Sequence, residues 1–304
     1  MVPCARDRAQ PDRVEAAGQR VRDATALSRR CALALVHTFA ALLSLPLVSP
    51  LEAVAALVQF GQGQTLSNSY VLIRAAESEA ESEGVTMTSP AQKNSTLLGI
   101  SPQGRLQLRE RTLPALGDLG VCEDGECWIW PSITQNSYQT AEVVARRLNT
   151  GRSAIVPEYS FLDARGVGAY ENTPVKESKA AIAALDKSSA RLKPPPGTDG
   201  TPNESAEDVL VRLRQVLSIT ETQYGGATVI LIAPDSDVLS ILQSAVLGID
   251  LRAHGTFAMA PGEVRVLRQR GAPFADAGVD VGGEVREESA STTIRCARPP
   301  ACLE

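Results

Sequence analysis

An arginine at the end of an apolar run is the first residue that could take part in chemistry. Residues 71–74 read Val-Leu-Ile-Arg, which predicts a buried strand, and Glu77-Ser78 follows after two alanines. A guanidinium can bind a phosphate or a carboxylate through two parallel hydrogen bonds. Arg74 therefore holds an anionic ligand or pairs with a carboxylate of the chain, for which the candidates are Glu77, Asp163 and Asp235. Glu77 and Ser78 themselves are expected to satisfy backbone donors of the turn.

A second polar group, Asp235-Ser236-Asp237, follows a later apolar run. We expect Asp235 to be the N-cap of a helix and Asp237 to be an acid of its first turn. Ser236, like Ser132 at the start of another predicted helix, lies where free backbone N–H groups could bind an anion, although capping is the commoner role of such serines. These acids do not have the spacing of a metal site, so no metal is predicted.

Strand-like and helix-like stretches alternate from residue 69 onward, which predicts an α/β fold. Strands are expected at 69–74, 128–130, 155–156 and 228–232. Helices are expected at 101–116, 134–148, 174–187, 205–220 and 235–247. Residues 256–259 and 264–267 are expected to pair as a hairpin around Pro261-Gly262. The stretch 191–204 is rich in proline and glycine and predicts an exposed insertion within one domain.

The composition is that of an ordinary globular protein, with 43% hydrophobic and 21% charged residues. Aromatic residues make up 4%, so aliphatic side chains must form most of the core. The net charge of -5 and the lack of a basic, aromatic-rich patch argue against a nucleic-acid partner.

Residues 1–55 predict a targeting presequence. The pair Arg29-Arg30 precedes the apolar run 31–45, and Pro46 and the small residues 53–55 follow. This order is typical of a twin-arginine export signal, here with cleavage after Ala55. A membrane anchor is the alternative, but the run is shorter than the ~20 apolar residues of a spanning helix and is interrupted by proline. No stable membrane span is therefore expected in the mature chain.

The stretch before the arginine pair is rich in arginine and alanine, and it resembles a transit segment placed ahead of a thylakoid-transfer signal. Such a bipartite presequence implies a chloroplast protein of the thylakoid lumen. Transit peptides carry few acidic residues, whereas this stretch contains Asp7, Asp12, Glu15 and Asp23. Twin-arginine export in a bacterium, to the periplasm or the medium, is therefore the alternative.

Four cysteines lie outside the predicted presequence and form two close pairs: Cys122 with Cys127, and Cys296 with Cys302. Asp124-Gly125, at the centre of the first pair, predicts a two-residue hairpin turn that sets the two cysteines opposite each other. We expect a disulfide in each pair, because the spacing fits zinc poorly. Disulfides agree with an oxidising compartment.

Five stretches between residues 69 and 268 resemble, in order, the motifs of the histidine phosphatase (phosphoglycerate mutase-like) superfamily. Arg74-Ala-Ala-Glu-Ser78 resembles Arg-His-Gly-Glu-Ser/Thr and matches it at three positions. The other stretches are 99–104, 132–142, 162–171 and 229–239, and 257–264 looks like the closing hairpin. The resemblance implies a three-layer αβα sandwich with a mostly parallel sheet. We expect this domain to span 56–270 and to be followed by an irregular tail, 271–304.

The chemistry of this family needs a nucleophilic histidine, two arginines and a second histidine around the phosphoryl group, and a carboxylic acid for the leaving oxygen. The resemblance places Ala75 at the nucleophile, Asn136 at the second arginine, Asp235 at the second histidine and Ala164, next to Asp163, at the acid. Of the usual set it retains Arg74.

The chain contains two histidines, His37 and His254. His37 lies in the predicted presequence, and His254 lies far in sequence from both histidine positions of the family. A mechanism with two histidines is thereby excluded, and we expect His254 to be structural or exposed.

We therefore expect a pseudoenzyme of this family without a cofactor, with a binding, assembly or scaffold role and protein partners in the lumen. Its remnant pocket could still hold an anion through Arg74, Ser78, Asn136, Arg165 and Ser236. Two alternatives remain: a phosphatase or other hydrolase that works through Asp163, Asp235 or a serine, and a sensor of phosphate or of a phosphate-bearing small molecule.

Overall fold

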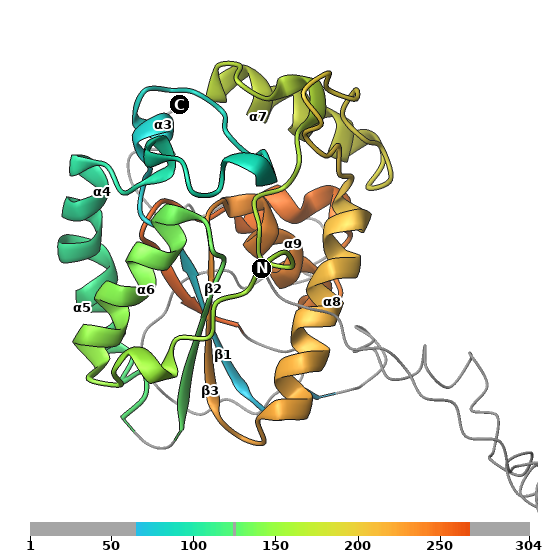
Figure 1. Cartoon of the computed structure of the whole chain (residues 1–304). Helices are drawn as coiled ribbons and strands as arrows, with labels where there is room; N and C mark the ends of the chain where they lie inside the picture. Colours follow the sequence, from blue (N-terminus) through green and yellow to red (C-terminus); the bar gives the residue numbers. More distant parts are fainter. Residues whose placement is uncertain (1–64, 124–125, 268–304) are drawn as a thin grey trace, which may run out of the picture. The chain divides into compact units, whose positions relative to one another are not determined.

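The computed structural model describes residues 65–123 and 126–267 (Figure 1). The predicted presequence and the tail 271–304 lie outside these ranges. Among the helices within them, none combines the length and the apolar character that crossing a bilayer requires.

Four strands form one mixed sheet: β1 (Ser69–Arg74), β2 (Cys127–Pro131), β3 (Thr228–Ala233) and β4 (Val264–Val266). Their order is β2-β3-β1-β4. β3 pairs in parallel with both β1 and β2, and β4 joins the other edge of β1 in the antiparallel direction. The carboxyl ends of β1 and β3 therefore meet at one edge of the sheet, where Arg74 is aligned with Ala233.

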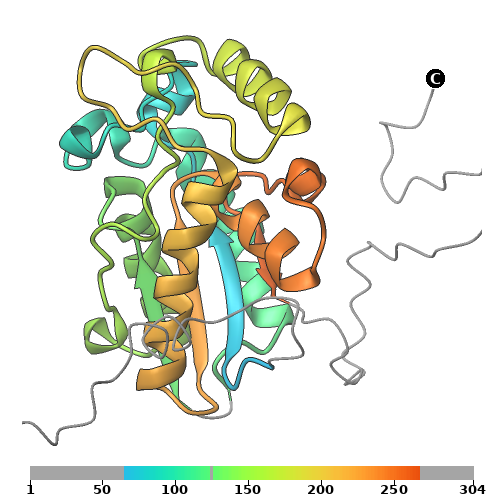
Figure 2. The same cartoon turned by 90° about the vertical axis from the view of Figure 1, so that its right-hand side faces the viewer.

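Four helices cover the two faces of the sheet (Figures 1 and 2). α8 (Ala206–Gln223) and α9 (Ser236–Leu247) pack on one face, and α5 (Leu113–Asp118) and α6 (Gln135–Leu148) pack on the other. This arrangement confirms the expected α/β class and its three layers.

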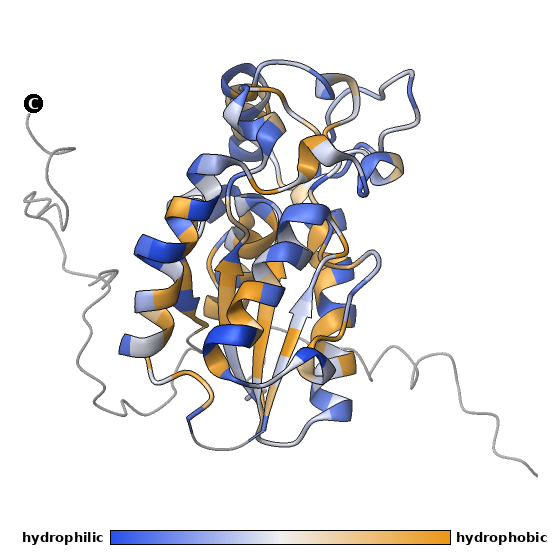
Figure 3. Ribbon diagram, turned by 60° about the vertical axis from the view of Figure 1, so that its left-hand side comes forward, coloured by the Kyte–Doolittle hydropathy of each residue, from blue (hydrophilic) through white to orange (hydrophobic). Residues whose placement is uncertain are grey.

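Alternation of side chains along β1 divides the core between the two faces. Tyr70 and Leu72 pack with apolar residues of α8 and α9, whereas Val71 and Ile73 pack with those of α5 and α6. Because both faces are buried, the strand is apolar along nearly its whole length, and the central strands β1 and β3 are mostly orange in Figure 3.

The described residues form further helical elements. They are α3 (Glu79–Ser82), α4 (Pro102–Gln107), α7 (Val175–Ser188) and short 3-10 helices at Pro90–Gln92, Thr96–Leu98, Arg152–Ala154, Gly168–Tyr170 and Leu251–Phe257. A π-helical turn, Leu108–Thr112, joins α4 to α5, so the predicted helix 101–116 is continuous but locally unwound. The predicted capping box of α8 and the glycine that ends α9 are both present.

The predicted hairpin around Pro261-Gly262 is wrong in its first arm. Residues up to Phe257 form a 3-10 helix, and β4 pairs with β1 instead of folding back on 256–259. The edge of β1 offers free backbone groups to this segment: Arg74 N–H donates to Glu263 O, and Gly262 N–H donates to Arg74 O. Similarly, the expected strand 155–156 is reduced to a single bridge between Ile155 and Ile129.

The disulfide between Cys122 and Cys127 is present, with the two Cα atoms 5.5 Å apart. Cys127 begins β2, but Cys122 lies in a turn with a left-handed φ of 65° rather than in a strand. The bridge therefore links the end of the α5 region to the start of β2. The second expected disulfide, between Cys296 and Cys302, stays a prediction, because Cys296 and Cys302 both lie outside the described residues.

The insertion 191–204 is mostly exposed, but it is also docked on the loop before α7. Ala169 N–H donates to Pro195 O, and Gly168 N–H donates to Pro202 O. Gly168 has a φ of 56°, and a Cβ at Gly166 would overlap the Pro202 carbonyl. The insertion thus fixes the backbone on either side of Val167.

Candidate functional site

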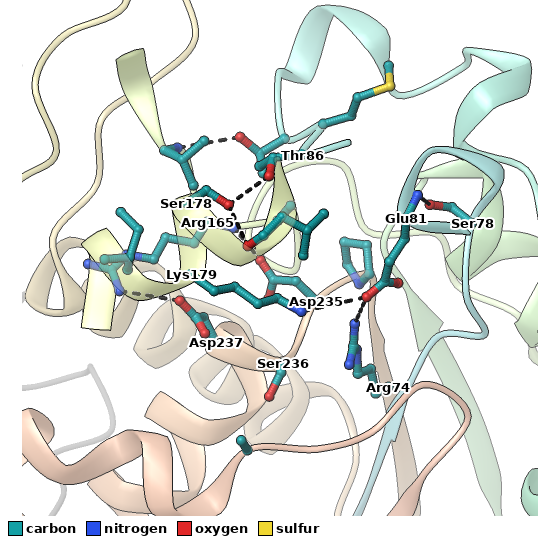
Figure 4. Close-up of a pocket in the computed structure, with 18 of the residues that line it drawn as sticks. Arg74, Ser78, Glu81, Thr86, Arg165, Ser178, Lys179, Asp235, Ser236 and Asp237 are labelled. Atoms are coloured by element: carbon teal, nitrogen blue, oxygen red, sulfur yellow. Dashed lines mark hydrogen bonds and ion pairs between the residues drawn. The ribbon is translucent and has the colours of Figure 1, made fainter. Parts of the chain in front are cut away.

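A cavity of about 550 Å³ lies at the carboxyl ends of β1 and β3, beneath α7 (Figure 4). In open α/β sheets this edge is the usual place for a ligand. Its walls come from the end of β1, α3, residues 85–98, the loop 163–167, α7, the start of α9 and the 3-10 helix before β4. The cavity brings together most of the residues that the sequence singled out: Arg74, Ser78, Asn136, Asp163, Ala164, Arg165, Asp235 and Ser236.

Arg74 is paired within the protein, with a partner that the sequence analysis missed. The residue is 5% exposed, its Nη2 forms an ion pair with Glu81, and its Nη1 donates to Met259 O at 2.9 Å. The three expected carboxylate partners are therefore wrong. Lys179 of α7 lies 3.7 Å from the same Glu81 carboxylate. Within the described ranges, Arg74 Nε has no hydrogen-bond partner.

Position 75, where the resemblance places the nucleophile, belongs to the apolar core. Ala75 is 1% exposed and packs in the cluster on the α5 and α6 side of the sheet, and its N–H donates to Ala233 O. A methyl group there has no lone pair to attack phosphorus.

Asn136, at the start of α6, holds the turn that follows β1. Its Nδ2 donates to Ala76 O at 3.1 Å, and the residue is 3% exposed. Thr140, one helical turn later, accepts from Ala76 N–H. Asn136 Oδ1 is buried and has no hydrogen-bond partner among the described residues. Asn136 therefore contributes a neutral amide to this wall of the cavity, at the position where the resemblance places a positively charged arginine.

Asp163 lies at the cavity wall beside Ala164 and is held by two partners. It forms an ion pair with Lys93 and accepts from Ser132 Oγ at 3.1 Å. Burial raises the pKa of Asp163, and the hydrogen bond from Lys93 opposes this shift. Ala164 contributes a backbone carbonyl, which accepts from Arg212 at 3.4 Å.

Arg165 is 1% exposed and lies at the centre of a buried network. Its two terminal nitrogens bind both oxygens of Asp186 on α7, at 2.7 and 2.9 Å. Its Nε donates to Glu204 O at 3.0 Å, and Asp237 lies 3.4 Å from Nη1. Arg165 therefore holds carboxylates of the chain and fastens the loop 163–167 to α7.

His254 completes this network and is buried, at 5% exposure. Its Nε2 lies 3.0 Å from Asp186 Oδ2, and its Nδ1 lies 2.8 Å from Ser240 Oγ. Burial opposes ionisation of Asp186, but hydrogen bonds from His254 and Arg165 outweigh it and lower the pKa of that carboxyl. The contacts agree with the expected structural role of His254.

The residues at the start of α9 are arranged as the sequence predicts. Asp235 is the N-cap: Oδ1 accepts from Val238 N–H at 3.0 Å, and Oδ2 accepts from Arg165 N–H at 2.7 Å. Burial raises the pKa of Asp235, and repulsion from Asp237 adds to the shift. Ser236 Oγ accepts from Met259 N–H at 2.8 Å.

Ser78 and Glu77 have the structural roles that were expected of them. Ser78 is the N-cap of α3 and accepts from Glu81 N–H at 3.2 Å. Glu77 turns toward the start of α4, where its backbone N–H and its carboxylate both bond Gln107.

The sequence analysis missed Glu81, Lys93, Lys179 and Asp186, all of which line the cavity. One of them carried a signal: Ser78-x-x-Glu81 has the pattern of a capping box. In the structure only the serine half of that box forms, and the Glu81 side chain turns to Arg74. Within residues 65–123 and 126–267, no group of three or more His, Cys, Asp or Glu side chains could hold a metal ion.

Comparisons with known proteins identify the family. No curated protein sequence matches the chain. Its fold is similar to a mycobacterial glucosyl-3-phosphoglycerate phosphatase (15% identity over 66% of this chain and 96% of that one, TM-score 0.48). It is also similar to Bacillus stearothermophilus YhfR (21%, 66% and 90%, TM-score 0.48) and to the alpha-ribazole phosphatase from Shigella flexneri (17%, 64% and 88%, TM-score 0.46). At these values the likeness carries no functional argument. The family model of the histidine phosphatase superfamily (branch 1), however, matches residues 70–275, which is more than half of the chain. The chain therefore belongs to the histidine phosphatase superfamily.

Proposed function

We propose that this protein is a non-catalytic member of its superfamily, with a binding, assembly or scaffold role in place of phosphoryl transfer. The observation that carries the proposal is the end of β1, where Ala75 packs into the apolar core. A phosphohistidine mechanism needs a ring nitrogen at this point, and the single histidine outside the predicted presequence, His254, is held by Asp186 and Ser240.

The electrostatics of the cavity support the same proposal. Transfer of a phosphoryl group needs fixed positive charge around the transferring oxygens. Here the charge of Arg74 is balanced by Glu81, and Asp235 lies where the resemblance expects a histidine. A phosphate dianion at the end of β1 would face both carboxylates.

The contacts also favour this proposal over a hydrolase that works through a carboxylate. Both oxygens of Asp235 already accept backbone N–H groups, so neither is free to attack as a nucleophile without breaking the cap of α9. Asp163 is occupied by Lys93 and Ser132. Phosphoryl transfer through a carboxylate commonly uses bound Mg²⁺, for which the described residues offer no cluster of ligands.

The test is phosphate release by the full-length protein from a panel of phosphomonoesters that includes p-nitrophenyl phosphate. We expect the rate to equal that of the Arg74→Ala and Asp235→Asn variants. Turnover in the wild type that either substitution abolishes would overturn the proposal. Using two variants matters because a buried arginine can also affect folding, which the melting temperature of each variant reports.

We also propose that the protein works in the thylakoid lumen, on protein partners. The twin-arginine pattern at Arg29-Arg30 supports this location, as does the Cys122–Cys127 disulfide, which suits an oxidising compartment. Import of the full-length chain into isolated chloroplasts tests it: we expect a processed, protease-protected lumenal form that disappears when both arginines are replaced by lysine. A lumenal form that persists after this replacement, or a product that stays in the stroma, contradicts the proposal. If the lumenal form is found as expected, crosslinking in the lumenal fraction identifies its partners.

A further inference from the structure

The cavity beneath α7 has an apolar roof. α7 turns Val175 and Ile182 toward it, at the spacing of residues on one helix face. The segment before α4 adds Val85, Met87 and Leu98. A volume of about 550 Å³ lies within the usual range for small-molecule sites, roughly 300–1,000 Å³. The cavity is therefore large enough for an organic ligand, and part of that ligand must be apolar.

The floor of the cavity has more carboxylates than cations. Three cations lie there, and each is already paired: Arg74 with Glu81, Lys93 with Asp163, and Arg165 with Asp186. Two more carboxylates, Asp235 and Asp237, have no cation of their own, although Asp237 lies 3.4 Å from Arg165. Two other basic residues of the lining, Lys187 and Arg252, are exposed. Lys179 of α7 is also mostly exposed, but its ammonium reaches to 3.7 Å from the Glu81 carboxylate, so the cavity holds five carboxylates against four nearby cations. Figure 4 shows Asp235, Asp237 and Ser236 grouped at the start of α9.

A buried acceptor in the cavity wall also lacks a donor. Asn136 is 3% exposed, and its Oδ1 has no partner among the residues that the structure describes. The orientation of its amide is set by the bond from Nδ2 to Ala76 O, so the oxygen is the free atom. Burial of an acceptor without a hydrogen bond is unfavourable, because the atom loses its bonds to water and gains none in return. A ligand with an N–H donor at this place would restore the missing bond.

We infer that this cavity binds an organic ammonium, with its protonated nitrogen at the floor near Asp235, Asp237 and Asn136 and its apolar body beneath α7. The ligand supplies a donor to Asn136 Oδ1, which lacks one, and positive charge beside Asp235 and Asp237. The inference deepens the proposed function and rests on it, because a cavity built to transfer phosphate would need the opposite charge at its floor.

The two carboxylates also repel each other, which raises the pKa of Asp235 in addition to the effect of burial. The other charged groups that face this pair are Arg165, Arg212 and Asp186. Arg165 is already bound by Asp186 on both of its terminal nitrogens. A bound ammonium ion would reduce the repulsion between Asp235 and Asp237, because its positive charge would lie close to both carboxylates.

Calorimetric titration of the full-length protein at neutral pH with four six-carbon probes tests the inference: hexylammonium, 1-hexanol, hexanoate and hexyl phosphate. We expect saturable binding of hexylammonium, at least tenfold tighter than that of 1-hexanol, and weaker binding still of the two anions. Affinity should also rise with chain length from butyl- to hexylammonium, by roughly two- to fourfold for each methylene placed under the roof.

Asp237→Asn, alone and together with Asp235→Asn, should weaken hexylammonium binding at least tenfold. Asparagine is also a good N-cap, so the second substitution preserves the cap of α9. Glu110→Gln, an exposed acid far from the cavity in the α4–α5 helix, is the matched control and should leave the affinity unchanged. Equal binding of 1-hexanol, tighter binding of either anion, or no binding of hexylammonium overturns the inference.

The same titrations separate this inference from the proposed function. Phosphate release from hexyl phosphate is measured in parallel. Such release would contradict the non-catalytic proposal whether or not hexylammonium binds. Absence of hexylammonium binding without any phosphate release would overturn the ligand class alone.

Discussion

The carboxylate of Glu81 binds the guanidinium of Arg74, seven residues earlier in the chain. Arg74 ends the central strand β1, and Glu81 lies in the short helix α3 that follows the turn. The resemblance places a phosphate-binding arginine at this position, and here a carboxylate of the same chain binds its guanidinium. The positive charge of Arg74 at the end of β1 is therefore balanced by the negative charge of Glu81.

Removal of the Glu81 charge should expose Arg74 to external anions. In Glu81→Gln, Arg74 and the nearby Lys179 both lose a carboxylate partner. Two charge-assisted hydrogen bonds of roughly 1.5–3 kcal/mol each correspond to a dissociation constant for phosphate between about 0.04 and 6 mM. We expect such binding in the variant by ³¹P NMR titration and none in the wild type. Glu83→Gln, an exposed acid at the end of α3, is the control. Equal phosphate affinity in wild type and Glu81→Gln would show that Glu81 does not block the arginine.

Asp186 should be the carboxylate on which stability depends most at acid pH. Its pKa is lowered in the folded protein, so its contribution is complete above the pKa of the unfolded chain, near 4, and is lost as pH falls through the lower folded value. Asp186→Asn leaves Arg165 buried without its main partner, which costs roughly 3–5 kcal/mol. Urea unfolding from pH 3 to 7 measures both effects: the wild type should lose stability toward pH 3, and the variant should be less stable with a weaker pH dependence. If the free energy of unfolding of the variant depends on pH as steeply as that of the wild type, groups other than Asp186 cause the loss of stability in acid.

Local signals in the sequence predicted the elements that carry the site. The apolar runs of β1 and β3, the N-cap Asp235 and the capping box at Ser205 each depend on neighbouring residues, and the structure has all of them. Because the carboxyl ends of parallel strands lie at the same edge of a sheet, the proximity of Arg74 and Asp235 in one cavity was also predictable.

The pairing of charges was not predictable, because it depends on where distant segments pack. Arg165 meets Asp186 across 21 positions, and His254 reaches the same carboxylate across 68. The hairpin prediction failed for a related reason: the edge of β1, which is distant in sequence, competes for the backbone of 262–266. Turn residues indicate that the chain bends there, but they do not say which strand the next segment joins.

Loss of the disulfide should destabilise the fold modestly. Cys122 and Cys127 close a loop with a sequence separation of 5, for which chain entropy gives about 2 kcal/mol. Both cysteines also pack against the apolar cluster on the α5 and α6 side. We expect urea unfolding under reducing conditions to show this loss, and Cys122→Ser to show it with or without reductant. A wild-type midpoint that reductant does not move would contradict the expected role of the bridge.

The contact between the insertion and the loop before α7 should depend on Gly166. A methyl group there would overlap the Pro202 carbonyl oxygen, so Gly166→Ala must push the insertion away from the loop that carries Arg165. Overpacking of this kind costs roughly 1–3 kcal/mol. We expect a lower unfolding free energy and faster amide hydrogen exchange at Gly168 and Ala169, whose N–H groups bond the insertion. Gly225→Ala is the matched control, because a Cβ there meets nothing within 4 Å and the backbone has no positive φ. If both variants behave alike, the contact between Gly166 and Pro202 does not support the loop, and Arg165 is held in place by its bonds to Asp186, Asp235 and Glu204.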